Sequence, residues 1–264
     1  MSMKSIAILG CGNIGLSIAE GLIKKDKKYA KQIIATRRNP KSLEGLKKQG
    51  VLITTNNCEA VKKSDIIIIA VKPYKVNEVL SEINHEITKT KILISVASEV
   101  SIDQILSKQN HAIPCFRVMP NTAAAIGESI TCISAKNASK KQIEEVQDLF
   151  SSFGQTVIIE EGLMEAATIL GACGIAYVLR FIRAMIQGGI QIGFDAKTAS
   201  LITTQAVKGA AELLLQNSSH PEQEIDKVTT PKGCTITGLN EMEHQGFSSA
   251  LIKGIVKSFE KIEK

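Results

Sequence analysis

Two short segments near opposite ends of the 264-residue chain hold residues that could bind negative charge. The first reads Gly10-Cys-Gly-Asn-Ile-Gly15, and the second reads Thr230-Pro-Lys-Gly-Cys-Thr235. Main-chain N–H groups at the start of a helix converge on an anion, and the helix dipole adds partial positive charge. Each segment precedes residues of helical spacing and is therefore predicted to be an anion-binding helix N-terminus. The alternatives are a merely structural glycine turn and an ordinary capping turn.

The glycine spacing of the first segment is typical of a dinucleotide site when it follows a strand and opens a helix. Here Ser5–Leu9 reads as a strand and Ile14–Lys24 as a helix. Gly10 permits the tight turn, and Gly12 lets a pyrophosphate approach the backbone. Gly15 allows the helix to pack closely on the strand. We therefore expect a dinucleotide pyrophosphate at this turn.

The choice of dinucleotide depends on the end of the next strand, which reads Ala35-Thr-Arg-Arg-Asn39. NAD-specific sites place an acidic residue there to hold the ribose hydroxyls, and this segment has none. Arg37 and Arg38 can pair with a 2′-phosphate through charge-assisted hydrogen bonds, each worth roughly 1.5–3 kcal/mol. We therefore expect NADPH as the cofactor, with NADH possible but weaker. Two solvated surface arginines are the alternative.

The elements that must position these residues alternate between strand and helix over residues 1–160. Besides the first strand, strands are expected at Gln32–Thr36, Val51–Thr54, Ile66–Val71, Lys91–Val96, Ala112–Val118, Ser129–Ser134 and Thr156–Ile159. Helices are expected at Pro40–Gln49, Tyr74–Ile87, Ile102–Lys108 and Ser139–Ser151. The run Asp65–Val71 is apolar on both faces, as in a central strand covered by helices. This pattern predicts an α/β fold, with an N-terminal doubly wound sheet of the Rossmann type as an NADP-binding domain.

The strand patterns stop near Glu161, and residues 161–264 are expected to form an all-helical C-terminal domain for substrate binding and dimerisation. Helical patterns cover Gly162–Ile192, Asp195–Gln216 and Glu222–Val228, and two more follow the second segment. Asp195 is expected to cap its helix. A single layer of such helices leaves apolar faces exposed, so a second subunit is expected to cover them.

Composition excludes several other classes of function. The formal net charge is +6, but the lysines are scattered and no basic stripe with aromatic residues is present, so nucleic acid is not expected as a partner. The six cysteines contain no CxxC pair and the four histidines match no metal-ligand spacing, so no metal is expected. No leader and no apolar run approaching a membrane span is recognised, so no membrane association is expected. Reduced thiols favour a cytoplasmic location.

Four segments resemble, in order and spacing, those of the pyrroline-5-carboxylate reductase family. They are the two segments above, Ala70–Pro73 (AVKP) and Arg117–Ala123 (RVMPNTA). The resemblance spans essentially the whole chain. It implies reduction of L-1-pyrroline-5-carboxylate to L-proline by hydride transfer from NAD(P)H, the final step of proline biosynthesis. It also implies a homodimer through the helical domain, and in some family members a larger ring of dimers.

The resemblance also implies roles for individual residues. The N–H groups of Gly233, Cys234 and Thr235, with the hydroxyl of Thr230, would hold the substrate carboxylate. The Thr235 hydroxyl, as the catalytic group, would reach the ring nitrogen. The residues expected at the cofactor are Gly10, Gly12, Asn13, Ile14, Gly15, Thr36, Arg37, Arg38, Asn57, Val71, Lys72, Pro73, Ala97, Met119, Pro120 and Asn121. The main task of the protein is to place the ring carbon against the hydride-bearing carbon.

The chain departs from the family pattern at three places. Ala97-Ser-Glu-Val100 stands where the family usually has AAGV, and Gly171–Tyr177 (GACGIAY) stands for SGSGPAY. Lys232 and Cys234 replace small residues. Glu99 would put negative charge near an anionic cofactor or substrate, and Lys232 would either offset it or add a contact to the substrate carboxylate. Two alternatives therefore stay open, an NADPH-dependent reductase of another cyclic imine and a non-catalytic NADP-binding paralogue.

Other catalytic assignments are less favoured. A hydroxyacid dehydrogenase of two-domain type needs a lysine acid/base on the first interdomain helix, and Gly171–Gln191 has Arg180 and Arg183 but no lysine. Glu165 and Tyr177 lie in helical runs and are interpreted as packing or surface residues rather than as acids.

Overall fold

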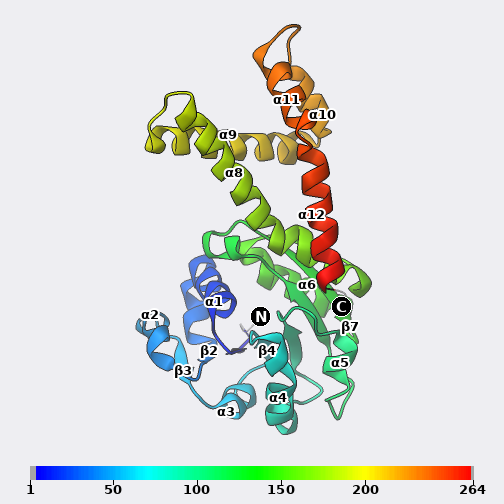
Figure 1. Ribbon diagram of the computed structural model, residues 1–264. Coiled ribbons are helices and arrows are strands. Elements are labelled where there is room, and N and C mark those ends of the chain that lie inside the picture. The colour runs from blue at the N-terminus through cyan, green and yellow to red at the C-terminus, as the bar shows by residue number, and fades with distance from the viewer. Residues whose placement is uncertain (1–3, 263–264) are drawn as a thin grey trace. The chain divides into compact units, whose positions relative to one another are not determined.

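The protein is described by a computed structural model that covers residues 4–262, and its sheet is laid out in Figure 1. The strands are β1 (Ile6–Leu9), β2 (Ile33–Thr36), β3 (Leu52–Thr54), β4 (Ile66–Ile69), β5 (Ile92–Ser95), β6 (Cys115–Met119), β7 (Ser129–Lys136) and β8 (Gly154–Ile158). Their order in the sheet is β3-β2-β1-β4-β5-β6-β7-β8. The strands β1 to β6 are parallel, whereas β7 runs antiparallel to β6 and parallel to β8.

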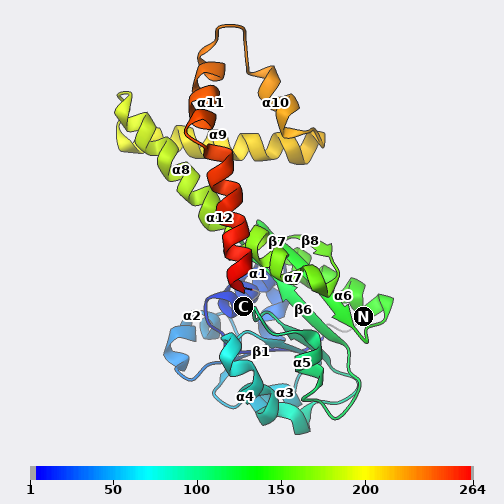
Figure 2. The same ribbon diagram turned by 45° about the vertical axis from the view of Figure 1, so that its right-hand side comes forward.

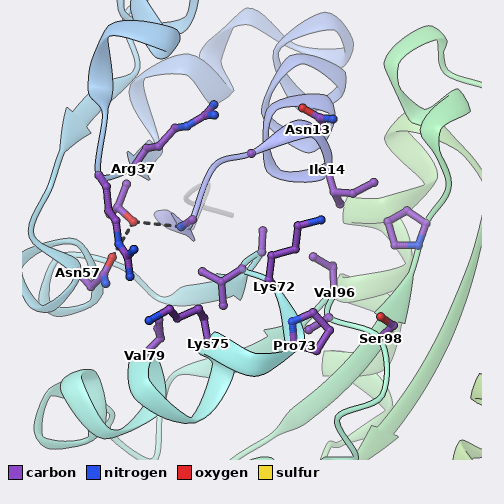
Figure 3. Close-up of a pocket in the computed structure, with 18 of the residues that line it drawn as sticks. Asn13, Ile14, Arg37, Asn57, Lys72, Pro73, Lys75, Val79, Val96 and Ser98 are labelled. Atoms are coloured by element: carbon purple, nitrogen blue, oxygen red, sulfur yellow. Dashed lines mark hydrogen bonds between the residues drawn. The ribbon is translucent and has the colours of Figure 1, made fainter. Parts of the chain in front are cut away.

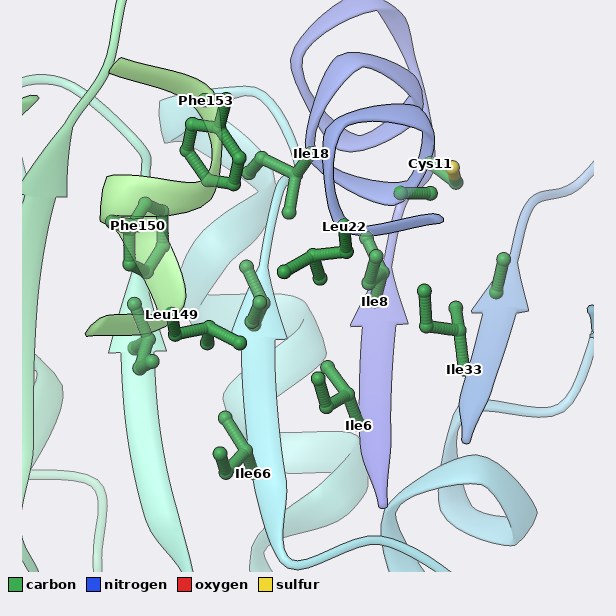
Figure 4. Packing of buried hydrophobic residues seen from close by; sticks show 14 of the residues in the cluster. Ile6, Ile8, Cys11, Ile18, Leu22, Ile33, Ile66, Leu149, Phe150 and Phe153 are labelled. Carbon is green, nitrogen blue, oxygen red and sulfur yellow. The ribbon is translucent and has the colours of Figure 1, made fainter. Parts of the chain in front are cut away.

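Helices cover both faces of this sheet. They are α1 (Asn13–Lys25), α2 (Glu44–Lys48), α3 (Asn57–Lys62), α4 (Pro73–Ile83), α5 (Ile102–Leu106) and α6 (Lys140–Phe150). In the first strand Ile6 and Ile8 join one hydrophobic cluster, with α1 and α6, and Ala7 and Leu9 join another, with α3, α4 and α5. Figures 1 and 2 show the two helical layers, and Figure 4 shows the cluster around α1 and α6. The doubly wound α/β fold predicted from the strand patterns is thus confirmed.

The strands β1 to β6 are shorter than the patterns predicted, whereas β7 extends past the expected Ser134 to Lys136. The helix α3 was not predicted. The expected strand Ala112–Val118 begins only at Cys115, because Pro114 directly before it has no N–H for the ladder. The expected strand at Thr156–Ile159 instead starts at Gly154 and ends at Ile158. The antiparallel direction of β7 returns the chain along the sheet without a crossover helix.

The remaining helices are α7 (Met164–Ala167), α8 (Gly174–Gln191), α9 (Ala196–Asn217), α10 (Pro221–Lys227), α11 (Cys234–His244) and α12 (Phe247–Ile262), with a π-helix at Thr168–Cys173. The contacts divide the chain into two compact units at Cys173 and Gly174, and the second unit ends at Lys261. The expected division lay at residues 160 and 161. Asp195 caps α9 as predicted, because its carboxylate accepts from the N–H groups of Lys197 and Thr198.

Candidate active site

A cavity of about 910 Å³ opens in the first unit, where the parallel strands end. Open α/β sheets bind ligands at this edge, beside the point where the strand order reverses, which here lies between β1 and β4. Every residue expected at the cofactor lines the cavity except Gly15. Figure 3 shows side chains from the glycine-rich turn, β2, α3 and α4 around the same space.

The glycine-rich turn has the shape that a pyrophosphate site requires. Gly10 has a φ of +78°, and a Cβ there would collide with the side chain of Val71. Gly12 is the N-cap of α1, with no side-chain cap and no acidic residue in the first turn. A Cβ at Gly15 would lie 3.1 Å from Cγ2 of Ile8, so Gly15 packs helix against strand instead of lining the cavity. The first N–H groups of α1 are left for an anion.

A hydrogen-bond network fixes the side of the cavity between β2 and α3. The hydroxyl of Thr36 accepts from the N–H of Gly10 at 3.2 Å and donates to Oδ1 of Asn57 at 2.6 Å (Figure 3). The Asn57 amide donates in turn to Glu82 on α4 at 2.8 Å. Thr36 is buried and lines the cavity together with Asn57, so this network fixes the orientation of Asn57 in the cavity wall.

The cavity contains four cationic side chains. Arg37 donates from Nη1 to the carbonyl oxygen of Cys11 at 3.2 Å, and Arg38 lies 3.5 Å from a carboxylate oxygen of Glu78. Lys72 and Lys75 also line the space. Burial raises the pKa of the Cys11 thiol to about 12, partly opposed by the charge of Arg37, so Cys11 stays a neutral thiol. The site therefore offers positive charge without a thiolate nucleophile.

Several lining residues were not predicted from the sequence. Lys75, Glu78 and Glu82 follow each other at helical spacing on α4 and lie on one face, a signal that the sequence did contain. Thr168 and Ala172 come from the π-helix. Others are Asn39, Thr55, Ala70, Val79, Val96, Ser98 and Thr122.

Asn121 lies at the cavity, but its side-chain amide is already engaged. Its Oδ1 accepts from the N–H of Ala123 at 2.9 Å, and its Nδ2 donates to the carbonyl oxygen of Gly171 at 2.9 Å. Asn121 therefore ties the end of β6 to the π-helix that carries Thr168 and Ala172.

Arg117 forms a second fixed point on β6. Its side chain is 3% exposed, and it donates to Glu165 at 2.9 Å and lies 3.5 Å from Glu161. Glu161 also accepts from the N–H of Ile102 at the start of α5. The packing role expected for Glu165 agrees with this pairing. Tyr177 donates to the hydroxyl of Ser258 at 2.8 Å within the second unit.

The second segment forms the N-terminus of α11 in the second unit. Gly233 is the N-cap, without a side-chain cap, and the first turn contains no acidic residue. A Cβ at Gly233 would lie 2.5 Å from Oγ1 of Thr230, so only glycine fits. The N–H groups of Cys234 and Thr235 precede the first helical hydrogen bond, from Thr237 to the carbonyl of Gly233, and point out of the helix start. This arrangement can hold a carboxylate.

Two of the departures noted in the sequence share one backbone conformation. Glu99 has a φ of 62° and Lys232 a φ of 58°, in the left-handed region that favours glycine. Glu99 stands at the glycine of the family pattern AAGV, and Lys232 stands where the family has a small residue. The chain therefore keeps the backbone path of a glycine and adds a charged side chain at each position.

Comparisons with known proteins agree with this geometry. Residues 161–264 match the family model described as pyrroline-5-carboxylate reductase dimerisation, and residues 5–99 match the model described as NADP oxidoreductase coenzyme F420-dependent. Pyrroline-5-carboxylate reductase 2 of Dictyostelium discoideum is 44% identical, with 99% of this chain and 93% of that protein covered. This chain belongs to the pyrroline-5-carboxylate reductase family. Pyrroline-5-carboxylate reductase 1 of the same organism is also 44% identical, and the chain spans about half (49%) of its length.

Solved structures of the family are equally similar over their whole length. The pyrroline-5-carboxylate reductase from Coxiella burnetii has a TM-score of 0.91 at 27% identity, covering 99% of this chain and 98% of that one. The Plasmodium falciparum enzyme with NADP bound has a TM-score of 0.89 at 26% identity, with the same coverage. The predicted family and activity are confirmed: the chain is an NAD(P)H-dependent oxidoreductase with pyrroline-5-carboxylate reductase activity.

The expectation that no apolar run approaches the length of a membrane span was wrong. An 18-residue window within the helical stretch Glu161–Gln191 has a mean hydropathy of 1.7, so the stretch is long and apolar enough, by length and composition alone, to cross a membrane. It lies within the region matched to the dimerisation model, which implies a homodimer. The exposed apolar side chains of α8, such as Leu179, Phe181 and Met185, lie in this region.

Proposed function

We propose that this chain reduces L-1-pyrroline-5-carboxylate to L-proline with NADPH as its preferred hydride donor and NADH as a weaker one. The observation that carries the preference is the end of β2, where Arg37 and Arg38 line the cavity and the segment Ala35–Asn39 itself contains no acidic residue. A 2′-phosphate gains charge-assisted hydrogen bonds there, and a ribose hydroxyl finds no carboxylate from this strand.

The residues of the first unit would bind the cofactor. The turn from Gly10 to Gly12 admits the pyrophosphate to the first N–H groups of α1. Val71–Pro73, Ala97 and Met119–Asn121 line the part of the cavity that would receive the nicotinamide. The bound cofactor supplies the hydride, and these residues hold the reacting ring in place and keep water from it.

The start of α11 would bind the substrate. The N–H groups of Cys234 and Thr235 would share the carboxylate with the Thr230 hydroxyl, strengthened by the helix dipole. The N–H of Gly233, also expected there from the sequence, already donates to the carbonyl oxygen of Thr230 at 2.9 Å. The Thr235 hydroxyl would act as the catalytic group by hydrogen bonding at the ring nitrogen. Little further acid–base equipment is required, because a protonated imine is already electrophilic.

The test is steady-state oxidation of NADPH and NADH with pyrroline-5-carboxylate, with proline identified as the product. We expect turnover with both donors and a kcat/KM at least about tenfold higher for NADPH, the value of one charge-assisted hydrogen bond. Equal kcat/KM values would refute the preference. Tight NADPH binding without turnover would instead support the non-catalytic paralogue. Faster turnover of the isomeric pyrroline-2-carboxylate would support a reductase of another cyclic imine.

A further inference from the structure

Two carboxylates reach the cofactor cavity from α4, although the end of β2 carries none. Glu78 and Glu82 line the cavity together with Lys75. They stand three and seven residues after Lys75, so all three lie on one face of the helix. The negative charge that is absent from β2 is therefore brought to the same space by another element.

Glu78 and Glu82 differ in what they contact. One oxygen of Glu78 lies 3.5 Å from Nη2 of Arg38 and the other lies 2.5 Å from Nζ of Lys75. Glu82 instead accepts from the neutral amide of Asn57 at 2.8 Å. The hydrogen bond from Lys75 and the charges of Lys75 and Arg38 hold the pKa of Glu78 below its usual value. Glu78 is thus an ionised group that forms ion pairs with two of the four cationic side chains of the cavity.

We propose that Glu78 is a specificity-determining residue that reduces the preference of this site for NADPH over NADH. The inference rests on the proposed role of Arg37 and Arg38 at the 2′-phosphate. A phosphate must compete with Glu78 for Arg38 and is repelled by its charge, whereas a neutral ribose hydroxyl is not repelled and can donate to a carboxylate. Glu78 thereby weakens the binding of NADPH but not that of NADH, and so allows the site to accept both cofactors.

The experiment uses two ligands that contain only the adenosine half of the cofactor. Dissociation constants of 2′-phospho-ADP-ribose and ADP-ribose are measured by titration calorimetry for the full-length wild type and for Glu78→Gln. We expect Glu78→Gln to tighten the phosphorylated ligand about fivefold, the range of an exposed charge pair, and to leave ADP-ribose within about twofold. A merely structural role of Glu78 would change both ligands alike.

Glu59→Gln is the matched control. Glu59 is an exposed carboxylate that pairs with Lys63 at 2.7 Å on α3 and does not line the cavity. Its substitution should leave the ratio of the two constants within about twofold. An unchanged ratio in Glu78→Gln, or an equal change in Glu59→Gln, would overturn the role of Glu78. Equal dissociation constants of both ligands for the wild type would refute the NADPH preference itself. If Glu78→Gln then bound 2′-phospho-ADP-ribose more tightly than ADP-ribose, the role of Glu78 would still be supported.

Discussion

The guanidinium of Arg37 donates a hydrogen bond to the main-chain oxygen of Cys11 across 3.2 Å. This contact joins the end of β2 to the glycine-rich turn that follows β1. An arginine carries five N–H donors in a rigid plane, so the contact holds the side chain in place and leaves other donors for a phosphate.

Removal of Arg37 should therefore weaken the phosphorylated cofactor selectively. In Arg37→Ala we expect the KM for NADPH to rise at least about tenfold, because at least one charge-assisted hydrogen bond is lost. The KM for NADH should change by less than about twofold. Lys24→Ala, an exposed cation near the far end of α1, is the control. Equal increases for both cofactors would contradict a role of Arg37 at the 2′-phosphate.

Two threonines of α11 allow a matched test of the proposed substrate site. Thr235→Ala should lower kcat/KM for the imine about ten- to a hundredfold and leave the dissociation constant of NADPH unchanged, because the lost bond is to a charged substrate. Thr235→Ser should recover most of the activity. Thr237 donates to the carbonyl of Gly233 at 3.1 Å, and Thr237→Ala should stay near wild type. Full activity of Thr235→Ala would remove Thr235 from the site.

Gly233 and Gly238 offer a second pair on the same helix. A Cβ at Gly233 would lie 2.5 Å from Oγ1 and 2.9 Å from the carbonyl oxygen of Thr230, whereas a Cβ at Gly238 meets nothing within 4 Å. Gly233→Ala should raise the KM for the imine, because Thr230 must move. Gly238→Ala should raise the free energy of unfolding by about 0.5–1 kcal/mol. Steady-state kinetics measure the KM and chemical denaturation measures the free energy of unfolding. If Gly233→Ala and Gly238→Ala had the same KM and the same free energy of unfolding, the crowding at Gly233 would be contradicted.

Replacement of Glu99 or Lys232 by glycine should stabilise the folded protein. A left-handed backbone costs a residue with a Cβ about 1–2 kcal/mol, and glycine returns part of this through its greater freedom when unfolded. Glu99→Gly and Lys232→Gly should therefore each gain about 0.5 kcal/mol in urea unfolding. Asn137, with a φ of 58°, is the control, because asparagine tolerates this region and Asn137→Gly should gain nothing. If Glu99→Gly and Lys232→Gly were both less stable than the wild type, the side chains of Glu99 and Lys232 would have to make stabilising contacts, which would contradict the prediction.

The buried Cys11 thiol should make stability depend on alkaline pH. Burial raises its pKa from an ordinary 9.0 to about 12, so above pH 9 the unfolded chain loses the proton first. The contribution of the protonated thiol to the free energy of unfolding is complete below pH 9.0 and is lost as the pH rises towards 12. Plots of the free energy of unfolding against pH should therefore be less steep for Cys11→Ala, by up to about 1.4 kcal/mol per pH unit. Parallel plots for wild type and variant would contradict this.

Local spacing was enough to predict the fold class and the part of the cavity formed by the glycine-rich turn and the two arginines, whereas Asn57, Val71–Pro73 and Met119–Asn121 were expected from the family resemblance. The glycines of the first turn and the two arginines after β2 act through short-range geometry that the chain order displays directly. The direction of β7 was not predictable, since a strand of alternating pattern reads the same either way. The six residues of α3 are too few to display a helical period. The pairing of Glu78 with Arg38 joins residues forty positions apart in the chain, so it depends on where the fold places α4 relative to the end of β2.

The buried arginine of β6 restricts how this region can change. Arg117 is 3% exposed, and its two carboxylate partners come from the segment that leads into the π-helix at the cavity. Loss of Glu165 alone would leave the buried guanidinium with only its 3.5 Å contact to Glu161, which is more harmful than replacing the cation and both carboxylates together by apolar groups. Homologous chains should therefore either retain these three charges as a set or exchange them as a set. In laboratory evolution of the cavity wall, single substitutions of Arg117, Glu161 or Glu165 should be the least tolerated.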